Sequence, residues 1–229
     1  MNSLKKTDKV IVADEGEVLD VEIEEDLLAA NRSLAESNRK LLKQHGVKSI
    51  DIRGSVGAGK TLLIERIVER LKDKYKISVI AGDVTTTIDA DRIQRYGVNT
   101  VQVNTGKECH LDAMLIKRAL KKIDLSKTNL LIIENVGNLI CPADFPLGAE
   151  LNVTVISVTE GDSMVLKHPM IFKDANVIVI NKIDLSEVMG TDVNKLIKDA
   201  QTVNPKAKII LTSAKRLDGL NELINALGL

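Results

Sequence analysis

Two cysteines and a neighbouring histidine are the residues of this sequence best suited to holding a transition metal. His110 directly follows Cys109 in ECHLDA, and Cys141 lies further along in NLICPADF. Zn²⁺ and Ni²⁺ accept thiolate and imidazole ligands, but three ligands are one fewer than a closed tetrahedral site needs. Such a site would be open, completed by water or shared with a second subunit. Free cysteines are also common core residues, so the spacing alone leaves both interpretations open.

A second group of residues predicts a site for the phosphates of a nucleotide. GSVGAGKT, residues 54–61, has the pattern G-x-x-x-x-G-K-S/T between an apolar run and a helical segment. In such a loop backbone N–H groups surround phosphate oxygens, a lysine reaches the β and γ phosphates, and a hydroxyl can bind Mg²⁺. The residues expected to bind the nucleotide here are Gly54, Ser55, Val56, Gly57, Ala58, Gly59, Lys60 and Thr61.

The segment NKID, residues 181–184, follows the apolar run VIVI and predicts which base the nucleotide carries. Guanine presents two adjacent N–H donors that the Asp184 carboxylate can accept together, whereas adenine has an acceptor there. Asn181 would brace the loop or reach the base, and the stem of Lys182 could lie over the ring. The backbone N–H of Ala214, in LTSAK, could donate to guanine O6. The residues expected around the base of GTP or GDP are Asn181, Lys182, Asp184, Ser213, Ala214 and Lys215.

Two carboxylates end strand-like runs between these motifs. Asp83 closes ISVIAGD and Glu134 closes LLIIE, so both should face the crevice edge of a parallel sheet, where they can hold Mg²⁺ or its waters. Gly137, in ENVG, is placed to donate its N–H to the γ phosphate and to sense its loss. Asp89 and Asp91 are expected to serve as turn and helix-cap residues, with a switch role as the alternative. The residues expected to carry GTP hydrolysis are Lys60, Thr61, Asp83, Glu134 and Gly137.

The sequence predicts slow intrinsic hydrolysis. Asn138 rather than a glutamine follows Gly137, and no arginine near either switch is an evident finger for the transition-state charge. Dimerisation or a partner would therefore have to accelerate turnover.

An alternating pattern of elements must position these motifs. From Ser49 onward, strand-length apolar runs alternate with helical segments, which predicts an α/β P-loop NTPase fold with a doubly wound, mostly parallel sheet. Residues 1–46 instead repeat Leu and Ala at helical spacing and predict an amphipathic N-terminal helix. We expect an N-terminal extension, 1–46, and a GTPase domain, 47–229. The polar segments 85–92 and 160–174 are expected to be mobile loops.

Composition argues against several classes of protein. The 32 basic and 32 acidic residues cancel, so no global field favours nucleic acid or an anionic membrane. No apolar run approaches the roughly 20 residues of a membrane span, and the N-terminus lacks the apolar core of a signal peptide. Two cysteines are too few for a disulfide scaffold. We expect a cytoplasmic protein with free thiols.

Several segments together closely resemble the hydrogenase nickel-incorporation GTPases, a SIMIBI-class P-loop family whose relatives include the urease accessory GTPase. These segments are IIENVGNLICPADF, NTGKECHLDA, AGDVTTTIDADRI, GSVGAGKT and VINKIDL. The resemblance implies a metallochaperone that uses GTP to help insert nickel into nickel–iron hydrogenase. By motif, Cys109, His110 and Cys141 would hold Ni²⁺ or Zn²⁺ at the interface of a GTP-dependent homodimer. A nickel or zinc metallochaperone and a hydrogenase large-subunit precursor are the implied partners.

Two departures limit this resemblance. Residues 1–46 contain no cysteine and only His45, so they lack the cysteine motif or histidine-rich stretch that some members use for nickel. Ser55 follows the first P-loop glycine, where some dimerising relatives carry a lysine.

Cys141 follows Gly137 so closely that movement of this switch should move a metal ligand. GTP would then order the switch and join two protomers, and hydrolysis would loosen the metal. Two alternatives remain open: an accessory GTPase for urease or a cobalamin enzyme, and a GTP-regulated binding switch whose cysteines belong to the core.

Overall fold

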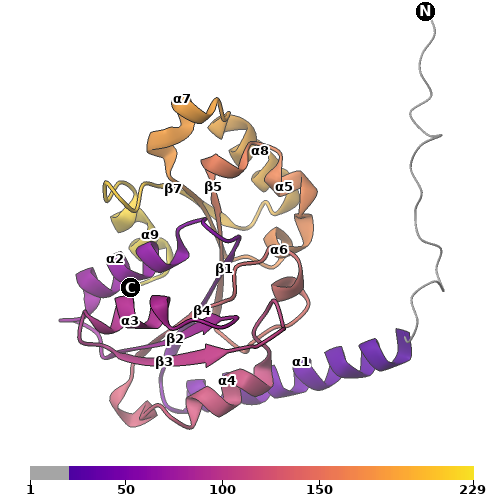
Figure 1. Cartoon of the computed structure of the whole chain (residues 1–229), viewed down its shortest axis with the longest axis vertical. Helices are drawn as coiled ribbons and strands as arrows, with labels where there is room; N and C mark the ends of the chain where they lie inside the picture. The colour runs from indigo at the N-terminus through magenta and orange to yellow at the C-terminus, as the bar shows by residue number, and fades with distance from the viewer. Residues whose placement is uncertain (1–20) are drawn as a thin grey trace, which may run out of the picture.

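The computed structural model describes residues 21–229 and shows an α/β fold built on a parallel sheet (Figure 1). Across these residues, seven strands lie in the order β3-β2-β4-β1-β5-β6-β7, and each neighbouring pair is parallel. The strands are β1 (Lys48–Gly54), β2 (Ile77–Asp83), β3 (Asn99–Asn104), β4 (Leu130–Glu134), β5 (Leu151–Ser157), β6 (Val177–Asn181) and β7 (Lys208–Thr212). The prediction of a doubly wound parallel sheet with an N-terminal helix is confirmed.

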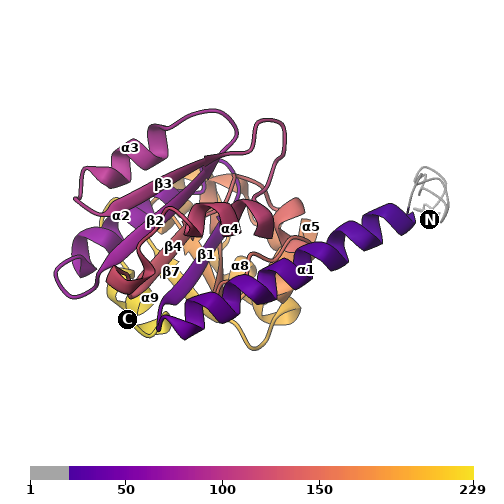
Figure 2. The same ribbon diagram turned by 90° about the horizontal axis from the view of Figure 1, so that it is seen from below.

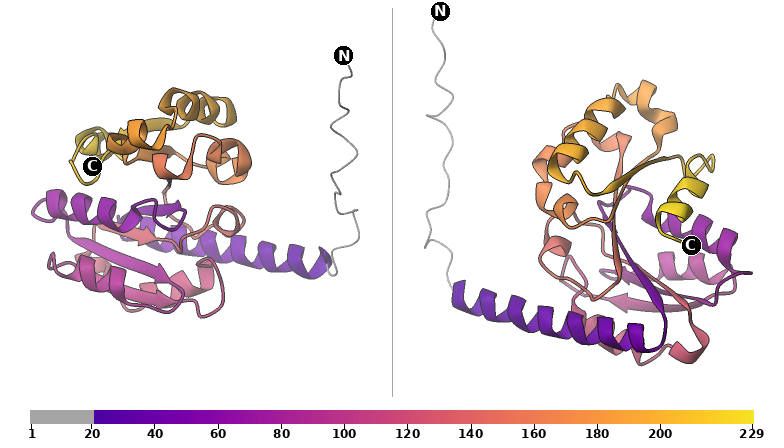
Figure 3. Two further views of the ribbon diagram at one scale, coloured as in Figure 1. Left: turned by 45° about the horizontal axis from the view of Figure 1, so that its top comes forward. Right: turned by 180° about the vertical axis from the view of Figure 1, so that it is seen from behind.

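Helices cover both faces of this sheet (Figures 1 and 3). One face packs against α2 (Lys60–Leu71), α3 (Ile88–Gln94) and α9 (Leu220–Ala226). The other face packs against α1 (Val21–Gln44), α4 (Ala113–Leu120), α5 (Met164–Lys167), α6 (Pro169–Lys173) and α8 (Val193–Val203), and α7 (Ser186–Met189) follows β6. The inner strands of the sheet are largely buried on both faces, which explains their continuous Val and Ile runs, whereas the edge strands β3 and β7 are only partly buried.

The N-terminal helix α1 packs its C-terminal half against the domain, and its first turns project beyond it (Figure 2). It ends at Gln44. Gly46 follows it with a φ of +66°, which suits glycine, and donates its N–H to the Lys43 carbonyl. Residues 1–20 of the predicted extension lie outside the described residues, so the division at residue 46 stays a prediction. Within residues 21–229, no helix is long and apolar enough to cross a membrane.

The prediction of loops at two polar segments is wrong. Residues 160–174 contain α5 and α6, because Val165, Ile171 and Phe172 are buried against the sheet and α8. Residues 85–92 contain the start of α3, which Ile93 anchors in the core. Apolar residues at helical spacing therefore determine both segments in spite of their polar neighbours.

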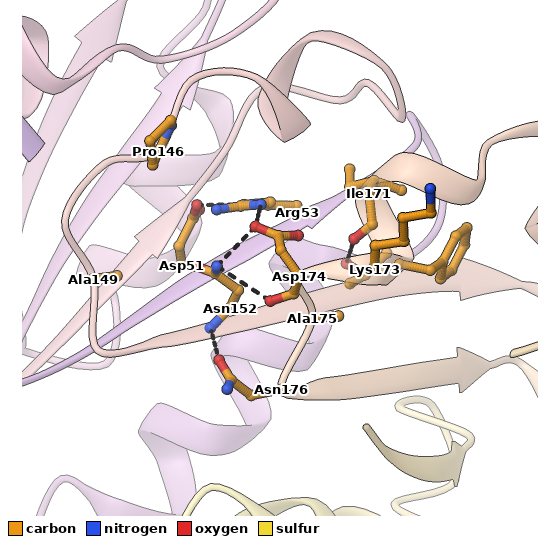
Figure 4. Close-up of polar contacts among 12 residues, drawn as sticks. Asp51, Arg53, Pro146, Ala149, Asn152, Ile171, Lys173, Asp174, Ala175 and Asn176 are labelled. Atoms are coloured by element: carbon orange, nitrogen blue, oxygen red, sulfur yellow. Dashed lines mark hydrogen bonds and ion pairs between the residues drawn. The ribbon is translucent and has the colours of Figure 1, made fainter. Parts of the chain in front are cut away.

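A buried ionic group occupies the face of β1 that carries no apolar side chain (Figure 4). Asp51 and Arg53 point to the same face because strand side chains alternate. Arg53, 1% exposed, donates from Nε to Asp51 Oδ2 at 2.6 Å and from Nη1 to Asp174 Oδ2 at 2.8 Å. Asn152 also donates to Asp174, at 3.0 Å. This group joins β1 and β5 to the loop after α6.

We expect Arg53→Ala to lower the free energy of unfolding by about 3–5 kcal/mol, because it leaves the Asp51 carboxylate buried without its cation. Urea unfolding followed by circular dichroism measures this loss. Lys127→Ala is the matched control: it removes an exposed ion pair of 3.3 Å with Asp124 and should cost less than about 1 kcal/mol. Equal losses in the two variants would contradict this prediction.

Candidate functional site

The loop between β1 and α2 forms a cradle at the carboxyl edge of the sheet. Lys60, at the start of α2, lies within this cradle, and its Nζ donates to the carbonyls of Gly54 at 3.2 Å and Ser55 at 3.0 Å. Gly59 has a φ of +98°, and a Cβ there would overlap Asn181 Nδ2. Glycine at this position therefore lets the 181–184 loop lie directly against the cradle.

Lys60 and Glu134 are buried in this cradle, and neither has enough partners of opposite charge to offset the loss of water around it. Thr61 Oγ1 donates to Glu134 Oε1 at 2.7 Å, while Glu134 Oε2 has no hydrogen-bond partner among residues 21–229. Burial raises the pKa of Glu134 to about 7, and burial lowers the pKa of Lys60. A phosphate beside Lys60 and a divalent cation beside Glu134 would supply the missing charges.

A hollow of about 300 Å³ is lined by most of the predicted phosphate and switch residues, but not by Gly54, Ser55 or Ala58. Asp83 and Gly137 line it beside Lys60, Thr61 and Glu134. Asp83 Oδ1 accepts from the N–H groups of Thr85 at 2.9 Å and Thr86 at 2.7 Å, so the carboxylate also holds the turn before α3.

Arg92 lines the same hollow, although the sequence had suggested no arginine near a switch. It donates to both carboxylate oxygens of Glu65, at 3.0 and 2.8 Å. Asp89 and Asp91 lie in the first turn of α3, where Asp91 accepts from the Thr87 hydroxyl at 3.0 Å. The one feature of the sequence that could have indicated this place for Arg92 is its position in residues 85–92, the polar segment that we expected to be a loop.

A second hollow, of about 190 Å³, adjoins the first, since Gly59 and Leu62 line both. Asp184 Oδ1 is buried there without a hydrogen-bond partner in the described part of the chain. An unpartnered carboxylate oxygen suits a ligand with N–H donors, as guanine has. The predicted base residues that line this hollow are Asn181, Lys182, Asp184, Ser213, Ala214 and Lys215.

Asn181 braces the base hollow, one of the two roles suggested for it. Its Nδ2 donates to the Ala58 carbonyl at 2.8 Å, and its Oδ1 accepts from Thr212 Oγ1 at 3.0 Å. The Ala214 N–H, which we expect to be able to donate to guanine O6, donates to Asn181 Oδ1 at 3.2 Å in the protein without nucleotide. Lys182 Nζ donates to the Gly57 carbonyl at 2.6 Å. These hydrogen bonds hold residues 181–184 against the phosphate loop, residues 54–61.

Cys109, His110 and Cys141 come together although 32 residues separate the two cysteines. The sulfur atoms lie 3.0 Å apart, and one ligand atom from each of the three residues lies within 4.8 Å of the others. His110 packs on Phe145 with ring centroids 4.0 Å apart, and its Nδ1 is buried without a hydrogen-bond partner in residues 21–229. Two sulfur atoms and an imidazole brought this close together are the types of ligand that a soft or borderline divalent metal binds.

Local electrostatics also suit a cation at this cluster. Burial lowers the pKa of His110, so its imidazole is neutral near pH 7, as a metal ligand must be. The pKa of the Cys141 thiol is raised, chiefly by the neighbouring Cys109 thiol and to a smaller extent by burial. A divalent cation between the two sulfur atoms would reverse that effect by favouring thiolates.

Asn138 connects the phosphate cradle to the metal-ligand cluster. Its backbone N–H donates to the Gly54 carbonyl at 3.0 Å, and its Nδ2 donates to the Cys109 carbonyl at 3.3 Å. The preceding Gly137 lies against Val56 so closely that a Cβ would come within 2.5 Å of a side-chain carbon. The segment of Gly137 and Asn138, the second switch, therefore lies between the two sites and contacts both.

Comparisons with known proteins agree with this geometry. The family model described as "CobW/HypB/UreG, nucleotide-binding domain" matches residues 48–211. A probable hydrogenase maturation factor HypB from Methanocaldococcus jannaschii is 52% identical over 204 residues, which are 89% of this chain and 92% of that protein.

Two solved structures have the same fold at substantial identity. The hydrogenase maturation factor HypB from Archaeoglobus fulgidus has a TM-score of 0.82 and 50% identity, and the match covers 87% of this chain and 98% of that one. HypB from Helicobacter pylori, solved in complex with nickel, has a TM-score of 0.82 and 38% identity, over 86% and 93% of the two chains. The chain therefore belongs to the CobW/HypB/UreG family of nucleotide-binding proteins and, within it, to the HypB hydrogenase maturation factors.

Proposed function

We propose that this protein is a GTP-hydrolysing metallochaperone that helps insert nickel into nickel–iron hydrogenase and couples its nucleotide state to metal transfer. The observation that carries the proposal is the double contact of Asn138, to Gly54 in the phosphate cradle and to Cys109 in the metal-ligand cluster. A guanine-nucleotide switch whose cysteines belong to the core does not account for an exposed Cys109 beside His110 and Cys141. Nickel in the related Helicobacter pylori structure supports the choice of cargo.

In the nucleotide site, each residue exchanges a contact within the protein for one to GTP. Lys60 would leave the carbonyls of Gly54 and Ser55 for the β and γ phosphates. The hydroxyl of Thr61 and the carboxylate of Glu134 would hold Mg²⁺ and its waters, with Asp83 beside them. Bound Mg²⁺ would neutralise phosphate charge during hydrolysis.

Slow intrinsic hydrolysis is consistent with the contacts around the phosphate hollow. The Asn138 side chain donates to Cys109, so it is not directed at an attacking water. Arg92 lies in the hollow, but its guanidinium is paired with Glu65. A second protomer or a partner would then have to complete the transition-state environment, in keeping with a GTP-dependent homodimer.

The metal site of this proposal has three ligands from one chain: Cys109, His110 and Cys141. Cys109 is exposed, so a second protomer or water can complete the coordination of Ni²⁺ or Zn²⁺. A metallochaperone would supply the metal, and the hydrogenase large-subunit precursor would receive it. Movement of Asn138 with the nucleotide would alter the position of the Cys109 backbone and so the metal affinity.

We expect Asp184→Asn to weaken GTP binding by about 10- to 100-fold and to favour XTP. The amide cannot accept both guanine N–H donors, whereas it can donate to the additional carbonyl of xanthine. Competition of GTP and XTP against a fluorescent nucleotide measures this exchange. Lys215→Ala, at an exposed residue of the same hollow, is the control and should keep the preference for GTP. An Asp184→Asn protein that still prefers GTP would remove this carboxylate from base recognition.

We expect the stability of the nucleotide-free protein, relative to Glu134→Gln, to fall as the pH rises from about 4.5 through about 7. The raised pKa means that folded Glu134 keeps a proton that the unfolded chain, with its ordinary pKa of 4.5, has already lost. Its stabilisation is complete below pH 4.5 and is lost above pH 7. Thermal unfolding of both proteins across this range measures the difference, and parallel pH profiles would contradict the prediction.

We expect the affinity for Ni²⁺ or Zn²⁺ to differ by about 5- to 150-fold between protein loaded with GDP and with a nonhydrolysable GTP analogue. Cys141→Ala should weaken metal binding in both states and leave nucleotide affinity unchanged. Asn138→Ala should still bind both metal and nucleotide, but its metal affinity should differ less between the GDP state and the GTP-analogue state. Calorimetric titration with light scattering measures affinity and dimerisation together. Equal metal affinity in the two nucleotide states of the wild type would refute the coupling.

A further inference from the structure

Two asparagines in α1 are buried in an otherwise largely exposed helix. Asn31 is 4% exposed and Asn38 is 1% exposed. They are seven residues apart, so both lie on the face of the helix that meets the domain. Asparagine has a lower helix propensity than the Leu, Ala, Glu and Lys around it. Their positions in a helix interior are therefore explained by what their side chains contact.

Both asparagines bind the beginning of α4 and the loop that follows Cys141. Asn31 Oδ1 accepts from the Ala113 N–H at 2.8 Å, and its Nδ2 donates to the Pro146 carbonyl at 3.0 Å. Asn38 Nδ2 donates to the Ala113 carbonyl at 2.9 Å and the Leu147 carbonyl at 3.2 Å. Ala113 is the first residue of α4, so its N–H has no acceptor within that helix.

These contacts lie on the two segments that carry the metal ligands. Ala113 follows His110 by three residues, and Pro146 directly follows Phe145, whose ring packs on His110. Gly148 lies against the Ala35 carbonyl of α1 with no space for a Cβ. The same face of α1 therefore joins the segment after Cys109 and His110 to the segment after Cys141.

We propose that Asn31 and Asn38 are positioning residues of the metal site, and that α1 thereby sets its metal affinity. This inference rests on the proposed metal-binding function. The ligands come from two loop segments whose sulfur atoms must approach each other before a cation binds. Side-chain hydrogen bonds that hold both segments from behind reduce the ordering that metal binding would otherwise require. Asn138 holds Cys109 from the nucleotide side, and α1 holds the opposite ends of the ligand segments.

The test measures Zn²⁺ affinity in competition with a chromophoric chelator, on full-length protein loaded with GDP. We expect Asn31→Ala and Asn38→Ala to bind Zn²⁺ roughly 10- to 100-fold more weakly than the wild type, the range found for residues that orient metal ligands. GDP affinity should stay within about twofold of wild type, since neither residue contacts the nucleotide hollows.

Leu42→Ala separates positioning from general loss of helix packing. Leu42 is a buried apolar residue of the same helix, and its side chain makes no hydrogen bond to the ligand segments. We expect it to lower thermal stability while keeping Zn²⁺ affinity within about twofold of wild type. An equal loss of affinity in Leu42→Ala would overturn the proposal, because helix stability alone would then explain the effect.

Asn31→Asp separates the two hydrogen bonds of Asn31, the one from the Ala113 N–H and the one to the Pro146 carbonyl. It also keeps the test informative if an alanine variant does not fold. An aspartate still accepts from the Ala113 N–H but cannot donate to the Pro146 carbonyl. We expect an affinity between those of the wild type and Asn31→Ala. In metal-free protein, amide hydrogen exchange of Ala113 should accelerate at least about tenfold in Asn31→Ala and little in Asn31→Asp.

The outcomes distinguish this inference from the proposed function. Wild-type protein that binds Zn²⁺ through Cys141, with asparagine variants that bind it equally well, would overturn only the role of α1. Wild-type protein with no Cys141-dependent Zn²⁺ binding would overturn the metal function and this inference with it.

Discussion

The carbonyl group of Gly54 is the point on which both sites depend. It accepts from Lys60 Nζ at 3.2 Å and from the Asn138 N–H at 3.0 Å. Gly54 can hold this position because it has no Cβ, which would overlap the Val155 carbonyl of β5. A phosphate that attracts Lys60 therefore alters the hydrogen bonding of an oxygen that also fixes the second switch. The P-loop and the switch are parts of one hydrogen-bonded structure.

Buried charge explains why this structure is suited to binding ligands as well as to folding. Arg53 has carboxylates on both sides, so the centre of the sheet carries a compensated charge. Glu134 and Asp184 are different, because each has a buried oxygen with no hydrogen-bond partner among residues 21–229. Burial disfavours the charge of Glu134 in the ligand-free protein and raises its pKa, whereas Asp184 keeps its charge beside Arg216, 3.7 Å away, and its pKa is lowered. In both residues the buried oxygen without a partner stabilises a complex with a ligand of matching charge or donors. The fold keeps them at the carboxyl edge of the sheet, where parallel strands leave a crevice.

The sequence predicted most of the architecture and the residues of the nucleotide site, because these depend on local patterns, whereas the metal-ligand cluster was implied only by the family resemblance. Continuous apolar runs identified the strands, and the glycine and lysine spacing of residues 54–61 identified the phosphate loop. Arg92 was not predicted, since its place in the hollow depends on how α3 packs beside α2. The hydrogen bond from Ala214 to Asn181, and the asparagines of α1, were also not predicted. Long-range pairs such as Asn31 with Pro146 leave no spacing pattern in one sequence.

A site of three ligands that is exposed on one side has a physical advantage for a protein that must give up its metal. A closed tetrahedral site of four buried ligands holds a metal as part of the fold and releases it only with difficulty. Here Cys109 is exposed, and its backbone is held on the nucleotide side by Asn138. In the proposed site an incoming ligand would therefore approach the metal on the exposed side, while a change at the phosphate cradle would move one ligand from behind. A fourth ligand from the same chain would stabilise the bound metal but weaken this dependence on the nucleotide, so the incomplete ligand set is consistent with transfer rather than storage.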